Sequence, residues 1–336
     1  MAQTLPLSPA VGTVRSSIRI ASIGTYLPEK RLTNADLSRL VDTDDAWIVR
    51  RTGIRERRIA EADEFTSDLC MAAVGDMQAR GGRLDGVDYV IACTSTPDYG
   101  FPSVATRLQH RLGLSNVGAI DVTAACAGFT YGLDVADALV NSGRARKVLV
   151  AAGETMSKVM DYQDRGTCIL FGDGAGVVLV DAPEDAPPTL LARRATSDGA
   201  LGKELFLTNL RSEIAGVVEP ERYLRQNGRA VYEWAVTAVT NGVAEMLDAA
   251  RLKPTDVDWF VPHQANKRII DASAHKLHIA PQKVVLTVDL HGNTSAASIP
   301  LALSVALADG RIKRGDLVLL EAMGGGFTWG SALLRW

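Results

Sequence analysis

Cysteine is the most nucleophilic side chain in this sequence, which contains four of them: Cys70, Cys93, Cys126 and Cys168. They form no CxxC pair and no metal-ligand spacing, and a chain of 336 residues can bury a core without disulfide bonds. We therefore expect reduced thiols in a cytoplasm and no bound metal. Three of the four lie in or beside apolar helix or strand patterns and are expected to be packing residues, namely Cys70, Cys93 and Cys168.

Cys126 occupies a different kind of position. Residues 119–143 predict a strand, a tight turn and a helix, with Gly143 as the helix stop. Cys126 would lie at the helix N-terminus among small residues that let a bulky thioester approach. Backbone N–H groups and the helix dipole are expected there to lower the thiol pKa from about 8.5 toward neutrality or below. This placement favours a nucleophile over a small buried core cysteine.

A thiolate nucleophile generally works with an imidazole or other polar groups positioned by the fold. His263 follows the apolar run WFVP and His291 ends the run VVLTVDL, so the two compete on position alone. Asn293 precedes a helix in which Pro300 is tolerable only in the first turn. Its amide could donate to an anion or simply form an Asx turn. Three further histidines are predicted to lie on the polar surface: His110, His275 and His278.

The elements that must position these residues alternate along the chain. Short apolar β-rich segments separated by helical patterns are typical of an α/β layered fold. The first half is predicted to contain strands at 18–23, 89–94, 119–123, 147–152 and 177–181. The second half is predicted to contain strands at 190–196, 259–262, 284–289, 317–321 and 331–336.

The two halves also resemble each other. DYVIACTST (88–96) resembles DWFVPHQAN (258–266), and SGRARKVLVA (142–151) resembles DGRIKRGDLVLLEA (309–322). Between these pairs a strand, a small-residue turn and a helix follow in the same order, which places Cys126 and Asn293 in equivalent turns. Two glycine-rich segments, 172–176 and 324–330, each lead into a closing strand. The sequence therefore predicts an internal duplication whose strand-end turns converge on one pocket.

Composition limits the remaining possibilities. The net charge of −3 argues against a dedicated nucleic-acid binder, and no apolar run is long enough for a membrane span. The N-terminus lacks the pattern of a secretory signal, so residues 1–17 are predicted to form a disordered tail. The acidic, proline-rich segment 181–188 separates a half at 18–183, which carries the cysteine, from a half at 184–336, which carries the histidine and asparagine.

Several motifs resemble β-ketoacyl-acyl carrier protein synthase III of bacterial fatty acid synthesis. They occur in family order from about residue 18 to residue 336: WIVRRTGIRER (47–57), DVTAACAGFTY (121–131), DRGTCILFGDGAG (164–176), VPHQAN (261–266), HGNTSAAS (291–298) and GGGFTWG (324–330). The resemblance implies the thiolase-like fold, a duplicated αβαβα five-layer sandwich, usually in a homodimer. That implication agrees with the internal repeat.

The same resemblance implies Cys126, His263 and Asn293 as the catalytic triad. In the family the cysteine takes an acyl group from acyl-CoA, a substrate rather than a cofactor. Malonyl-acyl carrier protein then loses CO2, and the resulting carbanion attacks the acyl-cysteine. His263 Nε2–H and the Asn293 amide would stabilise the enolate oxygen. The backbone N–H groups of Cys126 and Gly325 would form a second oxyanion hole.

Binding residues follow from the motifs in the same way. The resemblance implies that the adenine of CoA stacks between Trp47 and Arg165. The other implied contacts are Arg51 at the phosphates, Thr43, Gly228 and Asn266 along the tunnel, and Phe101, Leu224 and Met323 at the acyl pocket. Phe101 matches a phenylalanine that crosses the dimer interface. A basic patch would dock the acidic carrier protein, with Arg268, Lys267 and Lys276 as candidates.

Three residues depart from the family pattern: Arg229 replaces an asparagine, Met323 a phenylalanine, and Glu233 a basic docking residue of some members. These departures bear on substrate choice more than on chemistry. Alternatives within the family are an acyltransferase without decarboxylation, a secondary-metabolite condensing enzyme, or a non-catalytic partner subunit. A cysteine hydrolase is the alternative from another class, but it gives no reason for Asn293 or the CoA motifs.

Overall fold

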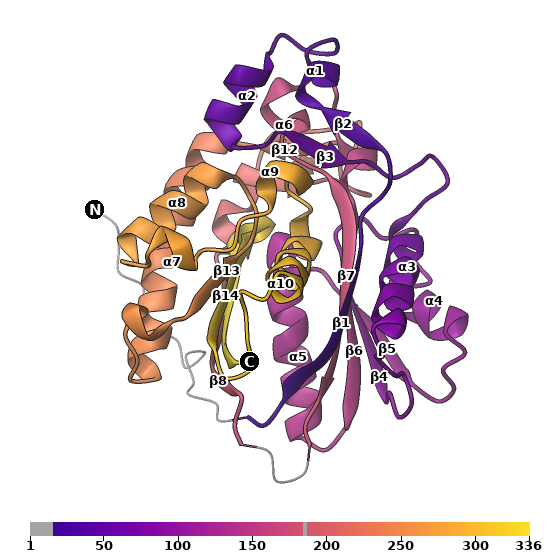
Figure 1. Cartoon of the computed structure of the whole chain (residues 1–336). Coiled ribbons are helices and arrows are strands. Elements are labelled where there is room, and N and C mark those ends of the chain that lie inside the picture. Colours follow the sequence, from indigo (N-terminus) through magenta and orange to yellow (C-terminus); the bar gives the residue numbers. More distant parts are fainter. Residues whose placement is uncertain (1–15, 184–186) are drawn as a thin grey trace.

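The computed structural model describes residues 16–183 and 187–336 and forms five layers (Figure 1). Two β-sheets are separated by a central layer of helices, and each sheet carries further helices on its outer face. The predicted α/β class and the thiolase-like αβαβα sandwich are confirmed. Residues 1–15 of the predicted tail and the segment 184–186 lie outside the described residues, and the proposed division of the chain at 183/184 stays a prediction.

The first sheet has five strands in the order β1-β7-β6-β4-β5. β4 runs parallel to β5 and β6, whereas β7 is antiparallel to both β6 and β1. The strands are β1 (Arg19–Tyr26), β4 (Tyr89–Cys93), β5 (Gly118–Val122), β6 (Lys147–Thr155) and β7 (Asp173–Asp181).

The second sheet repeats this order as β8-β15-β14-β13. β13 is parallel to β14, and β15 is antiparallel to β14 and β8, so each strand has a counterpart in the first sheet. Its strands are β8 (Leu190–Ser197), β13 (Trp259–Pro262), β14 (Leu317–Gly324) and β15 (Thr328–Arg335). The repeat seen in the sequence thus reappears as a repeat of strand order and direction.

Helices fill the three remaining layers. The central layer contains α5 (Gly128–Asn141) and α10 (Ser298–Ala308), which pack between the sheets (Figure 1). The outer face of the first sheet is covered by α3 (Thr66–Ala79) and α4 (Val104–Arg111), and that of the second by α7 (Gly228–Ala249) and α8 (Lys267–Lys276). None of the helices in the described ranges is long and apolar enough to cross a membrane.

Smaller elements gather at one end of the sandwich, above the central helices (Figure 1). They include α1 (Asn34–Leu37), α2 (Asp45–Thr52), α6 (Arg165–Cys168), α9 (Val288–His291), β2 (Arg31–Thr33), β3 (Glu56–Arg58), β9 (Leu205–Leu207), β10 (Glu213–Ile214), β11 (Val217–Val218) and β12 (Leu224–Gln226). Single 3-10 turns complete the described chain: η1 (Ala125–Ala127), η2 (Met156–Val159), η3 (Gly199–Glu204), η4 (Pro254–Asp256), η5 (Pro281–Lys283), η6 (Ser295–Ala297) and η7 (Gly325–Phe327).

One predicted strand is wrong. Residues 284–289 make only an isolated bridge, between Val284 and Phe260, before the chain turns into α9. The buried Gln264 side chain accepts hydrogen bonds from the backbone N–H groups of Thr287 (2.9 Å) and Val288 (3.2 Å). These donors are therefore satisfied by a side chain instead of a neighbouring strand, and His291 ends a helix, not a strand.

Candidate active site

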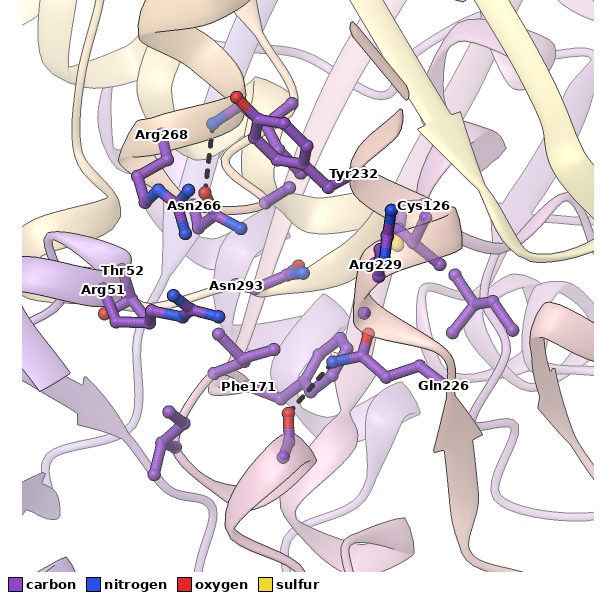
Figure 2. Close-up of a pocket in the computed structure, with 18 of the residues that line it drawn as sticks. Arg51, Thr52, Cys126, Phe171, Gln226, Arg229, Tyr232, Asn266, Arg268 and Asn293 are labelled. Carbon is purple, nitrogen blue, oxygen red and sulfur yellow. Dashed lines mark hydrogen bonds between the residues drawn. The ribbon is translucent and has the colours of Figure 1, made fainter. Parts of the chain in front are cut away.

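A cavity of about 680 Å³ opens among the elements at this end of the sandwich. Its walls combine residues of α2, α6, α7 and α8 with the turns that follow β5 and β13, so both repeats contribute (Figure 2). The structure brings these predicted site residues together on its lining: Trp47, Arg51, Cys126, Arg165, Gly228, His263, Asn266, Arg268, Asn293 and Met323.

Cys126 lies in the turn η1, directly before α5 begins at Gly128. Ala125 takes a left-handed backbone conformation (φ 46°), which turns the chain sharply between strand β5 and the helix. The opposite wall approaches so closely that a Cβ on Gly324 would lie 2.5 Å from the Cys126 backbone nitrogen. Only glycine fits there, and this holds the Cys126 amide beside the backbone at the end of β14.

The prediction that the helix N-terminus lowers the pKa of the Cys126 thiol is wrong. Cys126 is buried, and burial raises the pKa of its thiol to about 12. The nearby Glu154 carboxylate adds to the rise, while the Ser295 side chain and the Cys126 backbone N–H oppose it. Loss of hydration thus outweighs the helix N-terminus, because the thiolate would be enclosed by apolar groups. At neutral pH the Cys126 side chain is therefore a neutral thiol.

His263 follows β13 and is held by both its backbone and its ring. Its N–H donates to the Glu321 carbonyl (2.7 Å), and its Nδ1 lies 2.7 Å from Ser298 Oγ. Because Ser298 Oγ also accepts from the backbone N–H of Gln264 (3.3 Å), we assign its hydroxyl proton to Nδ1. Burial lowers the pKa of His263 to about 3. The imidazole is therefore neutral and carries its proton on Nε2.

Asn293 forms the predicted Asx turn and still presents a donor. Its backbone is fixed to the first repeat, since its N–H donates to Leu170 O (2.9 Å) and its carbonyl accepts from Gly172 N (3.0 Å). Its side-chain Oδ1 accepts from Ser295 N (2.9 Å). Among the described residues no hydrogen bond uses Nδ2, so the amide group keeps its donors for the cavity, where Figure 2 shows it between Arg51 and Arg229.

His291, the rival histidine, does not line the cavity. It ends the short helix α9, and burial lowers its pKa to about 4. The choice of His263 over His291 was an implication of the family resemblance. The position of His263 beside Cys126 and Asn293 on the cavity lining agrees with it.

Trp47 and Arg165 face each other at the cavity, as the motifs suggested. The Arg165 guanidinium carbon lies 4.9 Å from the centre of the Trp47 ring, and Arg165 also donates to the Asp42 carbonyl (2.6 Å). A flat base between them would need about 7 Å, two van der Waals contacts of about 3.5 Å each. Arg165 therefore covers the Trp47 ring, and the space between the two side chains is too narrow for a flat base.

Cationic side chains surround the cavity. Arg51 and Arg268 lie on its lining, and the Arg268 guanidinium packs over the Tyr232 ring at 5.3 Å (Figure 2). Arg229, one of the departures from the family pattern, also lines the cavity and pairs with Glu233 at 2.9 Å. Two of the three departures thus form one ion pair on α7, so each compensates the charge of the other.

Several predicted site residues lie off this cavity lining. Phe101 is 89% exposed in the loop before α4, and Leu224 is buried in a cluster with Met323. Lys267 pairs with Asp271 (2.5 Å), and Lys276 lies nine residues further along α8, which places it on the opposite side of the helix. The complete set off the lining is Thr43, Phe101, Leu224, Lys267, Lys276 and Gly325.

Sequence reasoning missed residues that support the site. Ser295 and Ser298 stand within the motif HGNTSAAS, and their spacing from Asn293 was the available signal. Glu154 carried no signal, because a single carboxylate at a strand end is unremarkable until its neighbours are known. Other lining residues were also missed, among them Phe171, Leu205, Gln226 and Tyr232.

Comparisons with known proteins agree with this fold and site. Residues 120–199 match the family model for 3-oxoacyl-[acyl-carrier-protein] synthase III, and residues 247–336 match its C-terminal part. The β-ketoacyl-[acyl-carrier-protein] synthase III of Bradyrhizobium diazoefficiens is 51% identical over 323 residues, covering 94% of this chain and 98% of that protein. Synthase III 2 of Bacillus subtilis is 48% identical and covers 96% and 99%, respectively.

Solved structures are similar over the same extent. The synthase III of Thermus thermophilus superposes with a TM-score of 0.91 at 45% identity, over 94% of this chain and 98% of that one. The priming β-ketosynthase of the R1128 polyketide biosynthetic pathway superposes with a TM-score of 0.86 at 35% identity, over 94% and 96%. The protein is thus a thiolase-fold condensing enzyme of the acyltransferase class. Within that class, the chain belongs to the β-ketoacyl-[acyl-carrier-protein] synthase III family.

Proposed function

We propose that this protein starts fatty acid synthesis by condensing an acyl-CoA primer with malonyl-acyl carrier protein, with loss of CO2. Cys126 attacks the thioester carbonyl of the primer, CoA leaves as a thiol, and an acyl-cysteine remains. One observation supports this most strongly. The Cys126 thiol, the His263 imidazole and the Asn293 amide, contributed by two repeats, lie on one cavity.

The second half-reaction needs stabilisation of an enolate. When the malonyl group loses CO2, negative charge develops on its thioester oxygen. Two neutral N–H donors, His263 Nε2–H and Asn293 Nδ2–H, suit this charge, because they need no proton transfer and are already oriented. The carbanion then attacks the acyl-cysteine carbonyl, and the Cys126 sulfur leaves. The backbone N–H groups of Cys126 and Gly325 serve as the donors to that carbonyl oxygen.

Substrate entry follows the cationic side of the cavity. Arg51 meets the CoA phosphates, and Trp47 and Arg165 separate to admit the adenine, while Thr43, Gly228 and Asn266 contact the pantetheine tunnel. Phe101, Leu224 and Met323 limit the acyl group. Arg268, with Lys267 and Lys276 on the same helix, attracts the acidic carrier protein. The support is that Arg268 is exposed and lies on the cavity lining.

The proposal extends to assembly and location. We infer a homodimer, since a phenylalanine as exposed as Phe101 is well suited to burial against a second copy. We also place the enzyme in the cytoplasm, because its four buried cysteines are all unbridged. Mass photometry of the wild type and of Phe101→Ser tests the first point. We expect a dimer whose dissociation constant rises in the variant, and a monomeric wild type contradicts it.

The two half-reactions can be measured separately. Purified enzyme is mixed with acyl-CoA, and its mass is followed. Acyl-enzyme is then mixed with malonyl-carrier protein, and CO2 and β-ketoacyl-carrier protein are quantified. We expect an acyl adduct in the first step and equal amounts of CO2 and product in the second. An adduct transferred to carrier protein without CO2 release would point to a plain acyltransferase, and an adduct lost to water would point to a hydrolase.

A further inference from the structure

Removal of the Cys126 proton lacks an acceptor in the mechanism described so far. Burial keeps the thiol neutral, yet a thioester is attacked by a thiolate. The imidazole of His263 cannot take this proton, because its Nδ1 already accepts from Ser298 and its Nε2 already carries hydrogen. The Asn293 amide is not a base. A further group must receive the proton.

A hydroxyl and a carboxylate stand behind the thiol. The Ser295 side chain is close enough to the Cys126 thiol to be one of the influences that lower its pKa, and the turns that carry the two residues are in contact. Ser295 Oγ in turn donates to Glu154 Oε1 at 2.9 Å. The turns η1 and η6, which carry Cys126 and Ser295, pack against each other, and η6 also packs against β6, in which Glu154 lies. The three groups therefore form a chain from sulfur to carboxylate.

Glu154 accepts hydrogen bonds on both carboxyl oxygens and has no cationic partner among the described residues. Its Oε2 accepts from Thr96 Oγ1 (2.6 Å), Thr94 Oγ1 (3.1 Å) and the Thr96 N–H (3.1 Å), and both oxygens accept from the Ser95 N–H (3.1 Å). Glu154 is fully buried, and within the described ranges it pairs with no lysine, arginine or histidine. These donors fix the carboxylate in place, while the lack of a counter-ion leaves it a strong proton acceptor.

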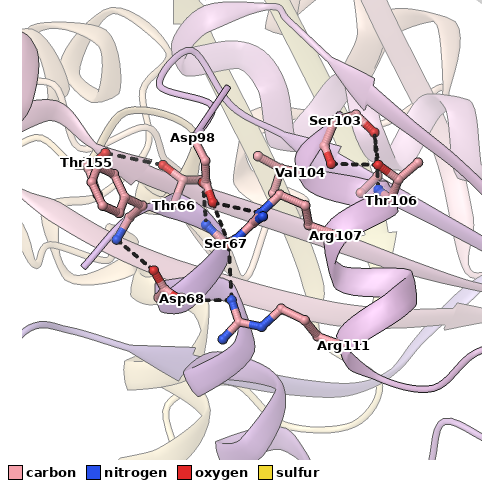
Figure 3. Close-up of polar contacts among 12 residues, drawn as sticks. Thr66, Ser67, Asp68, Asp98, Ser103, Val104, Thr106, Arg107, Arg111 and Thr155 are labelled. Carbon is pink, nitrogen blue, oxygen red and sulfur yellow. Dashed lines mark hydrogen bonds and ion pairs between the residues drawn. The ribbon is translucent and has the colours of Figure 1, made fainter. Parts of the chain in front are cut away.

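The loop that supplies these donors is itself anchored (Figure 3). Asp98 accepts from the Ser67 N–H (2.9 Å) and hydroxyl (2.6 Å) and pairs with Arg107 (3.0 Å). Thr66 Oγ1 donates to the Thr96 carbonyl (2.5 Å). The carboxylate therefore cannot swing away from Ser295 without disturbing the packing of α3 and α4.

Within residues 16–183 and 187–336, the charge of Glu154 acts on the pKa of three thiols: Cys70 from α3, Cys93 from β4 and Cys126 from η1. Burial raises the pKa of Glu154, and its hydrogen bonds oppose that rise. Burial raises the pKa of Cys70 and Cys93 even further above the ordinary range, so these two stay protonated. Cys126 is the only one of the three thiols that lies on the cavity lining.

The repeat shows that the Ser295 hydroxyl is not required by the backbone. Ala125 and Ser295 begin the equivalent turns η1 and η6, with nearly the same left-handed φ, 46° and 50°. Alanine therefore fits this conformation in this fold. What Ser295 adds is a hydroxyl between Cys126 and Glu154.

We propose that Glu154 is a positioning residue that acts through Ser295 to take up the Cys126 proton during self-acylation. This inference rests on Cys126 being the nucleophile of the proposed function. The thiol proton passes to Ser295 Oγ as the hydroxyl proton passes to Glu154 Oε1, which leaves a thiolate and a neutral carboxyl group. The thiolate forms a bond to the acyl carbon, the C–S bond to CoA breaks, and the proton returns along the same path to the departing CoA sulfur.

Two variants test the relay through the pH dependence of self-acylation. Ser295→Ala removes the hydroxyl, and Glu154→Gln keeps the shape of the side chain but removes the base. We expect each to slow self-acylation about 100- to 10,000-fold at pH 7, as for loss of a general base, with recovery as pH rises and KM for acyl-CoA unchanged. Pre-acylated enzyme should carry out the decarboxylation step at nearly the wild-type rate.

Thr94→Val is the matched control, because it removes a different hydroxyl from the same carboxylate. If Glu154 is only a structural clamp, Thr94→Val and Ser295→Ala will slow self-acylation alike and without a pH shift, which overturns the inference. It is also overturned if Ser295→Ala keeps the wild-type pH profile, an outcome that remains readable even if Glu154→Gln does not fold. A wild type that acquires no acyl group on Cys126 overturns the proposed function itself, and the relay with it.

Discussion

The turns η1 and η6 share a backbone but differ in chemistry. The turn η1 follows strand β5 and η6 follows the short helix α9, but each begins with a left-handed residue and leads into a central helix, α5 or α10. In the first turn the second position is Cys126, whereas in the second turn the same position is Ala296. The second turn instead supplies Asn293 just before it and Ser295 and Ser298 within and after it.

This difference shows how a duplicated fold can build an asymmetric site. The pseudo-symmetric strands bring both turns to one cavity, so the nucleophile needs to be present only once. In the mechanism that we propose, the second copy contributes donors to the reacting oxygen atoms and a proton path. The nucleophile and its partners are separated by more than 130 positions in the sequence, yet neighbouring elements hold them.

The largest effect should come from the nucleophile. Cys126→Ser is expected to abolish condensation, since a serine hydroxyl is far less acidic than a thiol and forms no comparable nucleophile at neutral pH. Cys168→Ala is the control, because Cys168 is a buried thiol of α6 that does not line the cavity. Turnover with acyl-CoA and malonyl-carrier protein is the measurement. A comparable loss of turnover in both variants would contradict the assignment of Cys126 as the nucleophile.

The next effect should separate the two turns by half-reaction. Asn293→Ala and His263→Ala each remove one donor from the enolate oxygen, so decarboxylation should fall about 100- to 1,000-fold. Self-acylation, which by our inference uses Cys126, Ser295 and Glu154, should change far less. Stopped-flow measurement of CO2 release from pre-acylated enzyme checks this. If both half-reactions fall equally in all variants, the division of labour between the turns is wrong.

A smaller effect concerns the strands that flank the turns. Ala151 is the register partner of Ala92 on neighbouring strands of the first sheet. At the equivalent position of the second sheet, Glu321 is the register partner of Pro262. Burial raises the pKa of Glu321 from 4.5 to about 8, and its Oε1 has no hydrogen-bond partner in the described part of the chain. Between pH 4.5 and 8 the folded protein therefore holds a proton that the unfolded chain releases.

The sign of the pH dependence follows from this proton. The contribution of Glu321 to the free energy of unfolding is fully present below pH 4.5 and falls as pH rises to 8, by up to about 1.4 kcal/mol per pH unit. Glu321→Gln lacks this dependence. Its free energy of unfolding should therefore rise by more than about 1 kcal/mol relative to that of the wild type between pH 4.5 and 8, and the difference should stay constant above pH 8. Urea unfolding at several pH values measures the difference. A constant difference would show that Glu321 is ionised throughout.

The smallest effect should be on carrier-protein docking at α8. Arg268→Ala is expected to raise the KM for malonyl-carrier protein by about 3- to 10-fold at low salt and by less at high salt, as for a partly exposed charge contact. Lys276→Ala, at the far end of α8 and off the cavity lining, is the matched control for whether docking is confined to the cavity side. Equal effects of the two variants would assign docking to the whole helix.

Much of the fold was predictable because burial leaves a clear pattern in the sequence. The strands of both halves carry apolar runs bounded by turns, and the repeated order of strand, small-residue turn and helix is visible in the residues themselves. The segment 284–289 has the same composition but not the same structure. Its N–H groups are satisfied by Gln264, a long-range contact that no local pattern reveals.

The site was predictable in position but not in electrostatics. Local sequence places Cys126 at a helix N-terminus, and that is correct. Its pKa depends on what covers the sulfur, and that covering comes from the other repeat and from β6. For the same reason the ion pair of Arg229 with Glu233 and the contact of Arg165 with Trp47 appear only once the chain is folded.

Peptide mapping after acylation tests the central claim most directly. The enzyme is incubated with a primer acyl-CoA, quenched in acid and digested, and each of the four cysteine peptides is weighed. The account predicts one acyl group on the peptide containing Cys126, which disappears when malonyl-carrier protein is added as β-ketoacyl product forms. An acyl group on Cys70, Cys93 or Cys168, or one that stays on Cys126 after malonyl-carrier protein is added, would contradict it.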